Sequence, residues 1–91
     1  MDSLSHQYAR SDRVEVSRVG ERAVLYHRDS GKALVLNPSG SWLWEHMNAP
    51  STHEQLAAAL QNRYALPAEQ AARDVQQFID DLRTHDAIVR S

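Results

Sequence analysis

The sequence predicts a single α+β domain, in which a three-stranded antiparallel sheet is followed by three helices in the order βββααα. Two observations predict it. Between residues 13 and 36, three short apolar segments are separated by turns of a few residues, which favours an antiparallel meander. Between residues 37 and 85, apolar residues recur at helical spacing behind helix-start signals. A chain of 91 residues has room for one hydrophobic core of this kind.

The predicted strands are Arg13–Val19, Arg22–Arg28 and Ala33–Leu36. Apolar and polar residues alternate in the first, as in a strand with one buried face, and the second is rich in residues that favour strands. A turn at residues 29–32 precedes the third strand, and its Gly31 can take the positive φ that such turns require. The polar, aperiodic segment Met1–Asp12 is predicted to be a flexible N-terminal arm, which leaves residues 13–91 as the domain.

The first helix is predicted to run from Pro38 to about Met47, because Asn37 is a favourable N-cap and proline is tolerated at the first helical position. The side chains expected on its inward stripe are Trp42, Leu43, His46 and Met47. Trp44 lies off that stripe and is expected to make a second contact.

The second helix is predicted to end near Tyr64. Ser51 and Thr52 can each cap its start, and Ser51-x-x-Glu54 fits a capping box. The residues expected to face inward are Leu56, Ala57, Leu60 and Tyr64.

The third helix, Pro67 to about His85, has the clearest 3.6-residue period in the chain. Its predicted inward residues are Ala68, Ala71, Ala72, Val75, Phe78, Ile79 and Leu82. Ala87–Val89 is predicted to close the domain as a short strand or wing. The result is winged helix-turn-helix-like, which makes a winged-helix DNA-binding regulator one alternative. Against DNA, the exposed face of the third helix mixes arginines with several carboxylates, which repel phosphate.

The composition limits the other function classes. The net charge of −2 gives no electrostatic signature for nucleic acid or an anionic membrane surface. The sequence has no cysteine, which excludes disulfides, thiolate metal sites and a cysteine nucleophile. Its longest apolar runs are about four residues, whereas a membrane span needs ~20. A cytoplasmic protein without membrane association is the expectation.

The chain also lacks a recognisable catalytic or metal-binding constellation. The five histidines, which have no ligand spacing, are His6, His27, His46, His53 and His85. Asp80 and Asp81 are adjacent on a helix and therefore point about 100° apart, so they do not share a proton. Ser39 and Ser41 beside Gly40 do not form a nucleophile elbow. We therefore expect no enzymatic activity, no metal and no cofactor.

Peptide or protein recognition is the remaining class, and the third strand is its best candidate. Ala33–Leu36 is short and apolar, and in a simple meander it lies at the edge of the sheet, where its N–H and C=O groups can pair with an added strand. The amphipathic third helix nearby would turn that edge into a groove. The other interpretation is that these residues only pack a core, and periodicity alone does not separate the two.

Several ordered fragments resemble the PqqD family of small peptide chaperones, or recognition elements, that serve ribosomally made and post-translationally modified peptides. The fragments are Tyr26-His-Arg-Asp-Ser-Gly31, Leu34-Val-Leu-Asn37, Leu43-Trp-Glu45, Thr52-x-x-Gln-Leu-Ala57 and Asp74-Val-x-x-Phe-Ile-x-x-Leu82. The resemblance covers Arg13–Val89, nearly the whole chain. The sequence departs from the family pattern at two turns, Asn48-Ala49-Pro50 and His85-Asp86-Ala87-Ile88.

The resemblance implies a fold of three strands and three helices in which the leader segment of a precursor peptide pairs with the third strand, beside the third helix. The strand residues that would meet the leader backbone are Lys32, Ala33, Leu34, Val35 and Leu36. The helix residues that would form the opposite wall are Asp74, Val75, Phe78, Ile79 and Leu82. A role in the core alone remains an equal alternative for Val75, Ile79 and Leu82.

The resemblance also implies the partners. The chain would hold a precursor peptide for an enzyme that does the chemistry, either a radical SAM maturase or a leader protease of the lasso-peptide kind. By binding the leader, it would raise the effective concentration of substrate at that enzyme.

Besides leader binding and DNA binding, a third hypothesis is a structural or dimerisation module. In it, two copies of the chain pair through the same edge of the sheet and form a homodimer.

Overall fold

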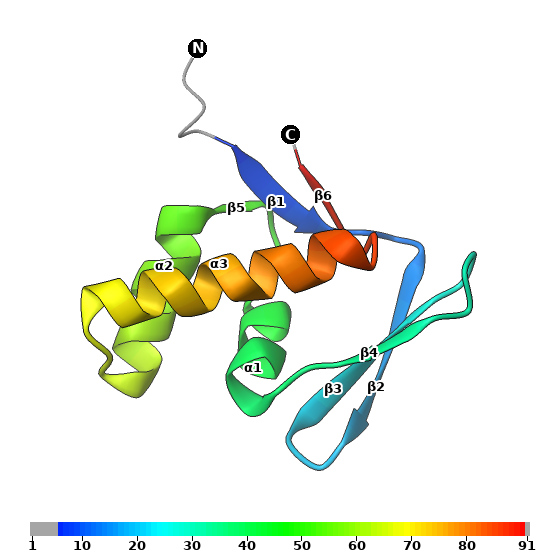
Figure 1. Ribbon diagram of the computed structural model, residues 1–91, viewed down its shortest axis with the longest axis horizontal. Helices are drawn as coiled ribbons and strands as arrows, with labels where there is room; N and C mark the ends of the chain where they lie inside the picture. Colours follow the sequence, from blue (N-terminus) through cyan, green and yellow to red (C-terminus); the bar gives the residue numbers. More distant parts are fainter. Residues whose placement is uncertain (1–5, 91) are drawn as a thin grey trace.

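A computed structural model describes residues 6–90, which form an α+β fold of three helices and two small antiparallel sheets (Figure 1). The elements in chain order are β1 (Gln7–Arg10), β2 (Val14–Val19), β3 (Arg22–His27), β4 (Ala33–Val35), α1 (Pro38–His46), β5 (Ser51–Thr52), α2 (His53–Tyr64), α3 (Ala68–Thr84) and β6 (Ile88–Arg90).

The predicted meander is confirmed as the sheet β2-β3-β4, with both pairs of neighbours antiparallel. Gly20 and Gly31 occupy the two turns with φ of 62° and 73°, in the left-handed region that glycine enters without a steric cost. The third strand ends at Val35, one residue earlier than predicted, because the Ser41 hydroxyl takes the place of the direct hydrogen bond between the Ala23 N–H and Leu36 O.

A second sheet, in the order β5-β1-β6, corrects the expectation of a flexible N-terminal arm. Residues 7–10 form β1, which pairs with β6 and with the two-residue strand β5. Tyr8 packs against the core, and the Arg10 guanidinium lies 5.6 Å from the centre of the Trp44 ring. Sequence patterning missed this strand because distant tertiary partners stabilise it. The first five residues of the expected arm lie outside the described part of the chain.

Helix α1 begins as predicted, since the Asn37 side chain accepts a hydrogen bond from the Gly40 N–H at 2.7 Å. Its predicted inward stripe is only partly right. Leu43 and Met47 are buried, but so is Trp44, at 3% exposed. Trp42 and His46 instead stack on each other near the surface, with ring centres 5.0 Å apart. Helix α1 contacts β3 and α2, and Arg10 of β1 lies against Trp44. These neighbours decide which sides of α1 are buried.

Helix α2 keeps its predicted end at Tyr64 and is capped by the second of the two predicted candidates, but its capping box is not the predicted Ser51-x-x-Glu54. Thr52 is the N-cap and forms a capping box with Gln55, with hydrogen bonds of 3.1 and 2.9 Å. Ser51, the other candidate, belongs to β5 and donates its hydroxyl to Ala49 O. The expectation that Tyr64 faces inward is also wrong, since its ring is 39% exposed and lies against Trp42.

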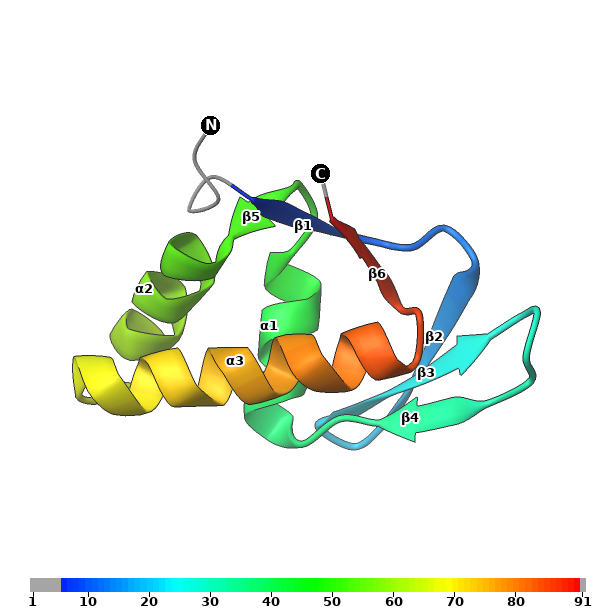
Figure 2. The ribbon, with the colours of Figure 1, turned by 45° about the horizontal axis from the view of Figure 1, so that its top comes forward.

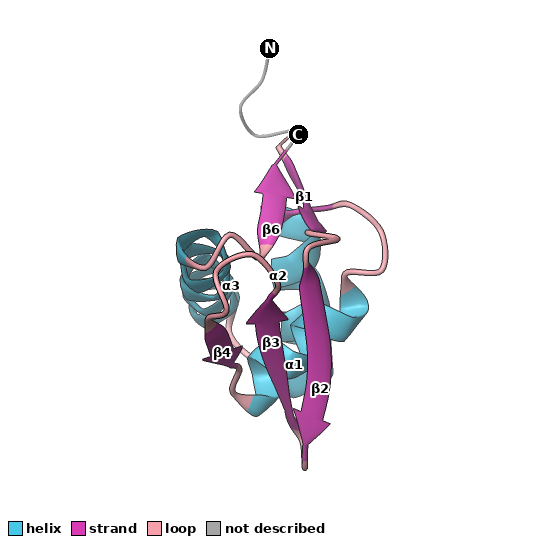
Figure 3. Ribbon diagram, turned by 90° about the vertical axis from the view of Figure 1, so that its right-hand side faces the viewer, coloured by secondary structure: helices cyan, strands magenta, loops and turns pink. Residues whose placement is uncertain are grey.

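Helix α3 packs against α2, which crosses it at a steep angle (Figure 2). It buries the apolar face that its periodicity predicts. The buried residues of this face are Ala71, Val75, Phe78, Ile79 and Leu82. Ala68, predicted to be inward, is exposed because it starts the helix beyond the end of the core. All three helices lie on one side of the β2-β3-β4 sheet, and its other side faces solvent (Figure 3). None of the described helices is long and apolar enough to cross a membrane.

Candidate functional site: a groove beside the edge strand

Strand β4 forms one edge of the meander, and its hydrogen bonds show which backbone groups are free. The Leu36 N–H donates to Ala23 O at 2.9 Å, and Lys32 O accepts from the end of β3 at 3.0 Å. Because bonded and non-bonded pairs alternate along an antiparallel ladder, every second residue of β4 bonds to β3. Ala33 and Val35 lie between these positions, so their N–H and C=O groups point away from the sheet, towards the open edge.

A buried serine fixes the end of this edge strand. The Ser41 side chain is 1% exposed and lies between the ends of β3 and β4. Its Oγ accepts a hydrogen bond from the Ala23 N–H at 2.7 Å and donates one to Leu36 O at 3.3 Å. The hydroxyl therefore satisfies two backbone groups at the point where the ladder stops. It ties the strand end to α1, and so sets where the free edge lies.

The ribbons of β4 and helix α3 lie on the same side of the molecule (Figures 2 and 3). Residues of both elements line a groove. The cavity within it has a volume of about 300 Å³. Its lining residues are Arg22, Val35, Leu36, Asn37, Ser39, Gly40, Leu43, Asp74, Gln77, Phe78 and Asp81. Leu36, Leu43 and Phe78 form an apolar floor, and polar side chains stand around it. An apolar cavity of about 150 Å³ accepts a benzene ring, so this one has room for a large side chain.

The same elements relate this chain to known proteins. Its sequence matches the family described as "Coenzyme PQQ synthesis protein D (PqqD)" over residues 22–88, which is more than half of its length. The chain belongs to the PqqD family. The resemblance carried by the ordered sequence fragments is thereby confirmed, and the matched range runs from the start of β3 to the first residue of β6. It therefore includes both walls of the groove.

A solved structure supports the fold of this PqqD-family chain. It is described as "TbiB1 in Complex with the TbiA(beta) Leader Peptide" and superposes with a TM-score of 0.78. The two chains share 22% sequence identity, and the match covers 88% of this chain and 93% of that chain. A search of curated proteins gave no match. Neither comparison points to a DNA-binding regulator.

The five strand residues predicted to meet the leader lie on or beside the free edge of β4. Lys32, Ala33 and Val35 are exposed, and Val35 lines the cavity with a side chain that is 55% exposed. Leu34 is half-buried on the inner face of the sheet. Leu36 is 5% exposed, yet its side chain contributes to the cavity floor. The strand thus presents backbone pairing groups at alternate positions beside the cavity, and leader binding by these residues stays a prediction.

The predicted helix residues divide into two groups. Asp74 and Phe78 line the groove. Val75, Ile79 and Leu82 are at most 1% exposed and belong to the core, so the structure corrects their assignment to the groove wall. The physical reason is the helical period: these three side chains point towards the core, about 80–140° around the helix from Asp74.

Sequence reasoning missed several lining residues. Gln77 and Asp81 follow Asp74 at intervals of three and seven residues, which places all three on one side of the helix. That spacing was a signal that could have identified them. Arg22, Ser39 and Gly40 reach the groove only because β3 and the start of α1 meet there, and no local pattern indicates this.

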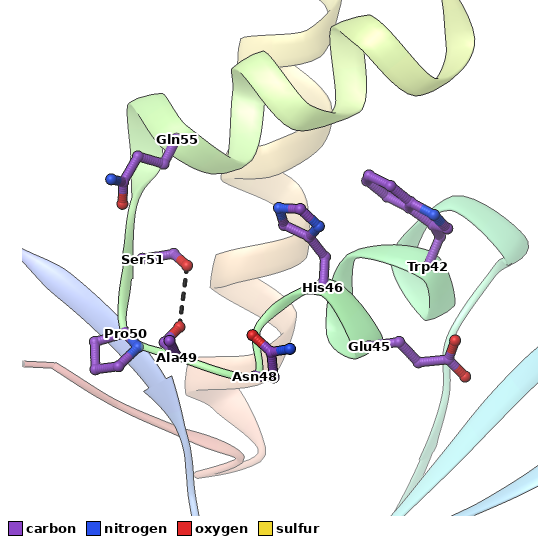
Figure 4. Close-up of a pocket in the computed structure, with 8 residues that line it drawn as sticks. All are labelled: Trp42, Glu45, His46, Asn48, Ala49, Pro50, Ser51 and Gln55. Atoms are coloured by element: carbon purple, nitrogen blue, oxygen red, sulfur yellow. Dashed lines mark hydrogen bonds between the residues drawn. The ribbon is translucent and has the colours of Figure 1, made fainter.

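A second depression lies between the end of α1 and the start of α2 (Figure 4). It has a volume of about 640 Å³, with Trp42 and His46 on one side and Gln55 on the other. Its polar groups are largely engaged: the Ser51 hydroxyl bonds to Ala49 O, and the Gln55 side chain serves the capping box. It is a weaker candidate for binding than the groove beside β4. Within residues 6–90, no group of three or more His, Asp or Glu side chains is placed to hold a metal ion.

Proposed function

We propose that this chain binds the leader segment of a ribosomally synthesised precursor peptide by adding it as a strand to β4, and presents it to a partner enzyme. The single observation that carries the proposal is the free edge, at which Ala33 and Val35 direct their backbone groups beside an open groove. Membership of the PqqD family supports it, as does the structural similarity to TbiB1, which is described in complex with a leader peptide.

In this proposal, backbone pairing and side-chain burial each contribute to the affinity for the leader. The leader's N–H and C=O groups bond to Ala33 and Val35, which gives affinity that depends little on sequence. Alternate leader side chains enter the groove, over the floor formed by Leu36, Leu43 and Phe78. Because β4 is only three residues long, backbone pairing alone is modest, and the groove must supply much of the affinity.

The chain contributes no chemistry of its own in this proposal. The partner enzyme, a radical SAM maturase or a leader protease, acts on the core peptide while this chain holds the leader in the cytoplasm. Holding the leader turns the encounter of enzyme and core peptide into an intramolecular event at raised effective concentration. A stimulation of modification or cleavage by the added chain, lost when the leader is removed from the precursor, tests this step.

Self-pairing through β4 is the competing use of the same edge. If two copies pair through it, the mass in solution rises with concentration and falls when leader peptide is added. If the mass is that of a monomer at all concentrations, the edge is free for the leader.

The decisive experiment is a titration of the fluorescently labelled leader encoded beside this gene, read by anisotropy. Saturable binding is expected for the wild-type chain. Val35→Pro, which removes an N–H at the free edge, should weaken it tens- to hundreds-fold. A cognate leader that does not bind at high micromolar concentration, with or without the enzyme, would falsify the proposal. A gel-shift series across salt concentrations is the parallel test for DNA, because DNA binding weakens steeply with salt.

A further inference from the structure

Helix α3 presents an acidic face to the groove. Asp74, Gln77 and Asp81 lie on one side of it and line the cavity. The Gln77 side-chain amide donates to Asp81 Oδ1 at 3.0 Å, which holds that carboxylate in place. The salt bridges within residues 6–90 are Arg13–Asp29 and Arg18–Glu45, so neither groove carboxylate has a cationic partner there. Two carboxylates, of which Asp81 is held in place, therefore face the space that the leader would occupy.

The residues around Asp74 and Asp81 make their attraction for a basic side chain stronger. The opposite wall, Ala33–Val35, is uncharged, and the floor is apolar. Water screens the electric field of a charge less when the charge lies beside an apolar, low-dielectric surface than when it lies on an open surface. The one cation among the lining residues, Arg22, is at the start of β3 and forms no ion pair with Asp74. A basic side chain entering the groove would thus meet unneutralised carboxylates.

The geometry of an added strand fixes where such a side chain must be. In a strand, side chains alternate, so every second leader residue faces α3. Asp74 and Asp81 are seven residues apart, or ~10.5 Å along the helix axis, with Phe78 between them. Four strand residues span ~13 Å, a similar distance. If one leader side chain lies above Phe78, the next side chains that face the groove are two residues before and two residues after it. These two positions lie near the two carboxylates.

We propose that the groove selects an extended segment in which an apolar side chain is flanked, two residues away on at least one side, by lysine or arginine. The apolar side chain occupies the cavity above Leu36 and Phe78. The basic side chain pairs with Asp74 or Asp81. This inference rests on the proposed function, because it assumes that the segment adds as a strand to β4, and it goes further by defining the sequence class of the bound peptide.

The test is a selection from a displayed library of random fifteen-residue peptides, carried out on the wild-type chain and on the double variant Asp74→Asn/Asp81→Asn. Wild type should enrich an apolar residue with lysine or arginine two positions away. The double variant should keep the apolar preference and lose the basic one. Synthetic peptides from the wild-type selection should bind the double variant about five- to twenty-fold more weakly, given up to about five-fold per partly exposed pair.

Asp80→Asn is the matched control. Asp80 is next to Asp81 and accepts the same kind of hydrogen bond, from the Gln76 side chain at 3.0 Å, but it does not line the groove. Its neutralisation removes one negative charge from the helix, as Asp81→Asn alone does, and should leave the selected sequences unchanged. Added salt should weaken binding to wild type and to Asp80→Asn, and have less effect on Asp74→Asn/Asp81→Asn.

The outcomes separate this inference from the proposed function. Peptides that require the Val35 N–H but show no basic preference overturn the inference and leave strand addition intact. Equal loss of binding in Asp80→Asn and Asp81→Asn also overturns it, since the effect would then be one of net charge. A library that yields no peptide sensitive to Val35→Pro overturns both.

Discussion

The two edges of the meander, β2 and β4, differ in almost every property that governs strand addition. Strand β2 has six residues, and Glu15 and Arg18 place charges along it. Arg18 forms a salt bridge to Glu45, and Arg13, just before the strand, forms one to Asp29. Strand β4 has three residues and carries no charge. Charged side chains on an edge strand are a common protection against unwanted pairing, so the longer edge is the protected one.

The neighbourhood of each edge completes the contrast. Beside β4 lies the cavity with its floor of Leu36 and Phe78, whereas no residue of β2 lines either of the two cavities. The comparison teaches that a docking edge is defined less by the number of free backbone groups than by what surrounds them. Backbone pairing is available at both edges, but only β4 also offers apolar burial for alternate side chains of the added strand.

The largest expected effect comes from a matched pair of proline variants, Val35→Pro and Val16→Pro. The two valines are 55% and 51% exposed. Because hydrogen-bonded and non-bonded residues alternate along an antiparallel pair, the N–H of each valine points away from β3. In an edge strand, proline at such a position leaves the pairing with the neighbouring strand intact. The two variants should therefore keep similar stability, measured by urea unfolding.

Leader binding should separate them. Val35→Pro loses a hydrogen bond and leaves a leader carbonyl unpaired, a cost of ~2–4 kcal/mol, or tens- to hundreds-fold in Kd. Val16→Pro should bind like wild type in the anisotropy titration. Equal loss in both variants would mean that the contrast between the two edges is wrong.

The next effect in size concerns Ser41, which acts on the β4 side of the sheet only. Ser41→Ala should leave the buried Ala23 N–H without its partner and lower the free energy of unfolding by ~1–3 kcal/mol. Amide hydrogen exchange should speed up at Leu36 more than in β2. If protection falls evenly over the whole sheet, Ser41 is a general core residue and does not fix the edge.

A smaller effect is expected from Gly40→Ala, which adds a methyl group at the groove. The new Cβ would lie 3.5 Å from Phe78 Cδ1 and 3.0 Å from Asn37 Oδ1. The gain in helix propensity of up to ~1 kcal/mol offsets crowding at the cap, so stability should change by less than ~1 kcal/mol. Leader affinity, measured by titration calorimetry, should fall about three- to ten-fold because the cavity is partly filled. Unchanged affinity would place the bound peptide away from α1.

The smallest effect should follow from Arg18→Ala on β2. Both side chains of its ion pair with Glu45 are about half exposed, at 45% and 54%, where such pairs contribute ~0–1 kcal/mol. Leader binding should not change, and chemical denaturation should register at most that small loss. A marked loss of leader affinity would show that β2, too, takes part in docking.

Much of the fold was predictable because its signals are local. Asn37-Pro38 marked the start of α1 through cap chemistry, the 3.6-residue period marked α3, and Gly31 marked a turn. The wrong predictions concern features that depend on elements distant in the sequence. Strand β1 exists because of β5 and β6, and Trp44 is buried because of where α1 lies. Neither dependence leaves a periodic pattern in the residues concerned.

The candidate site divides in the same way. The sequence by itself determined that Ala33–Val35 is an uncharged strand, that an amphipathic helix follows, and that catalytic and metal-binding motifs are lacking. Only the tertiary structure decided which groups face the groove. Val75 and Asp74 are neighbours in the chain, yet one is buried in the core and the other lines the cavity. Periodicity gives the angle between side chains, but which angle meets solvent depends on where the other elements pack.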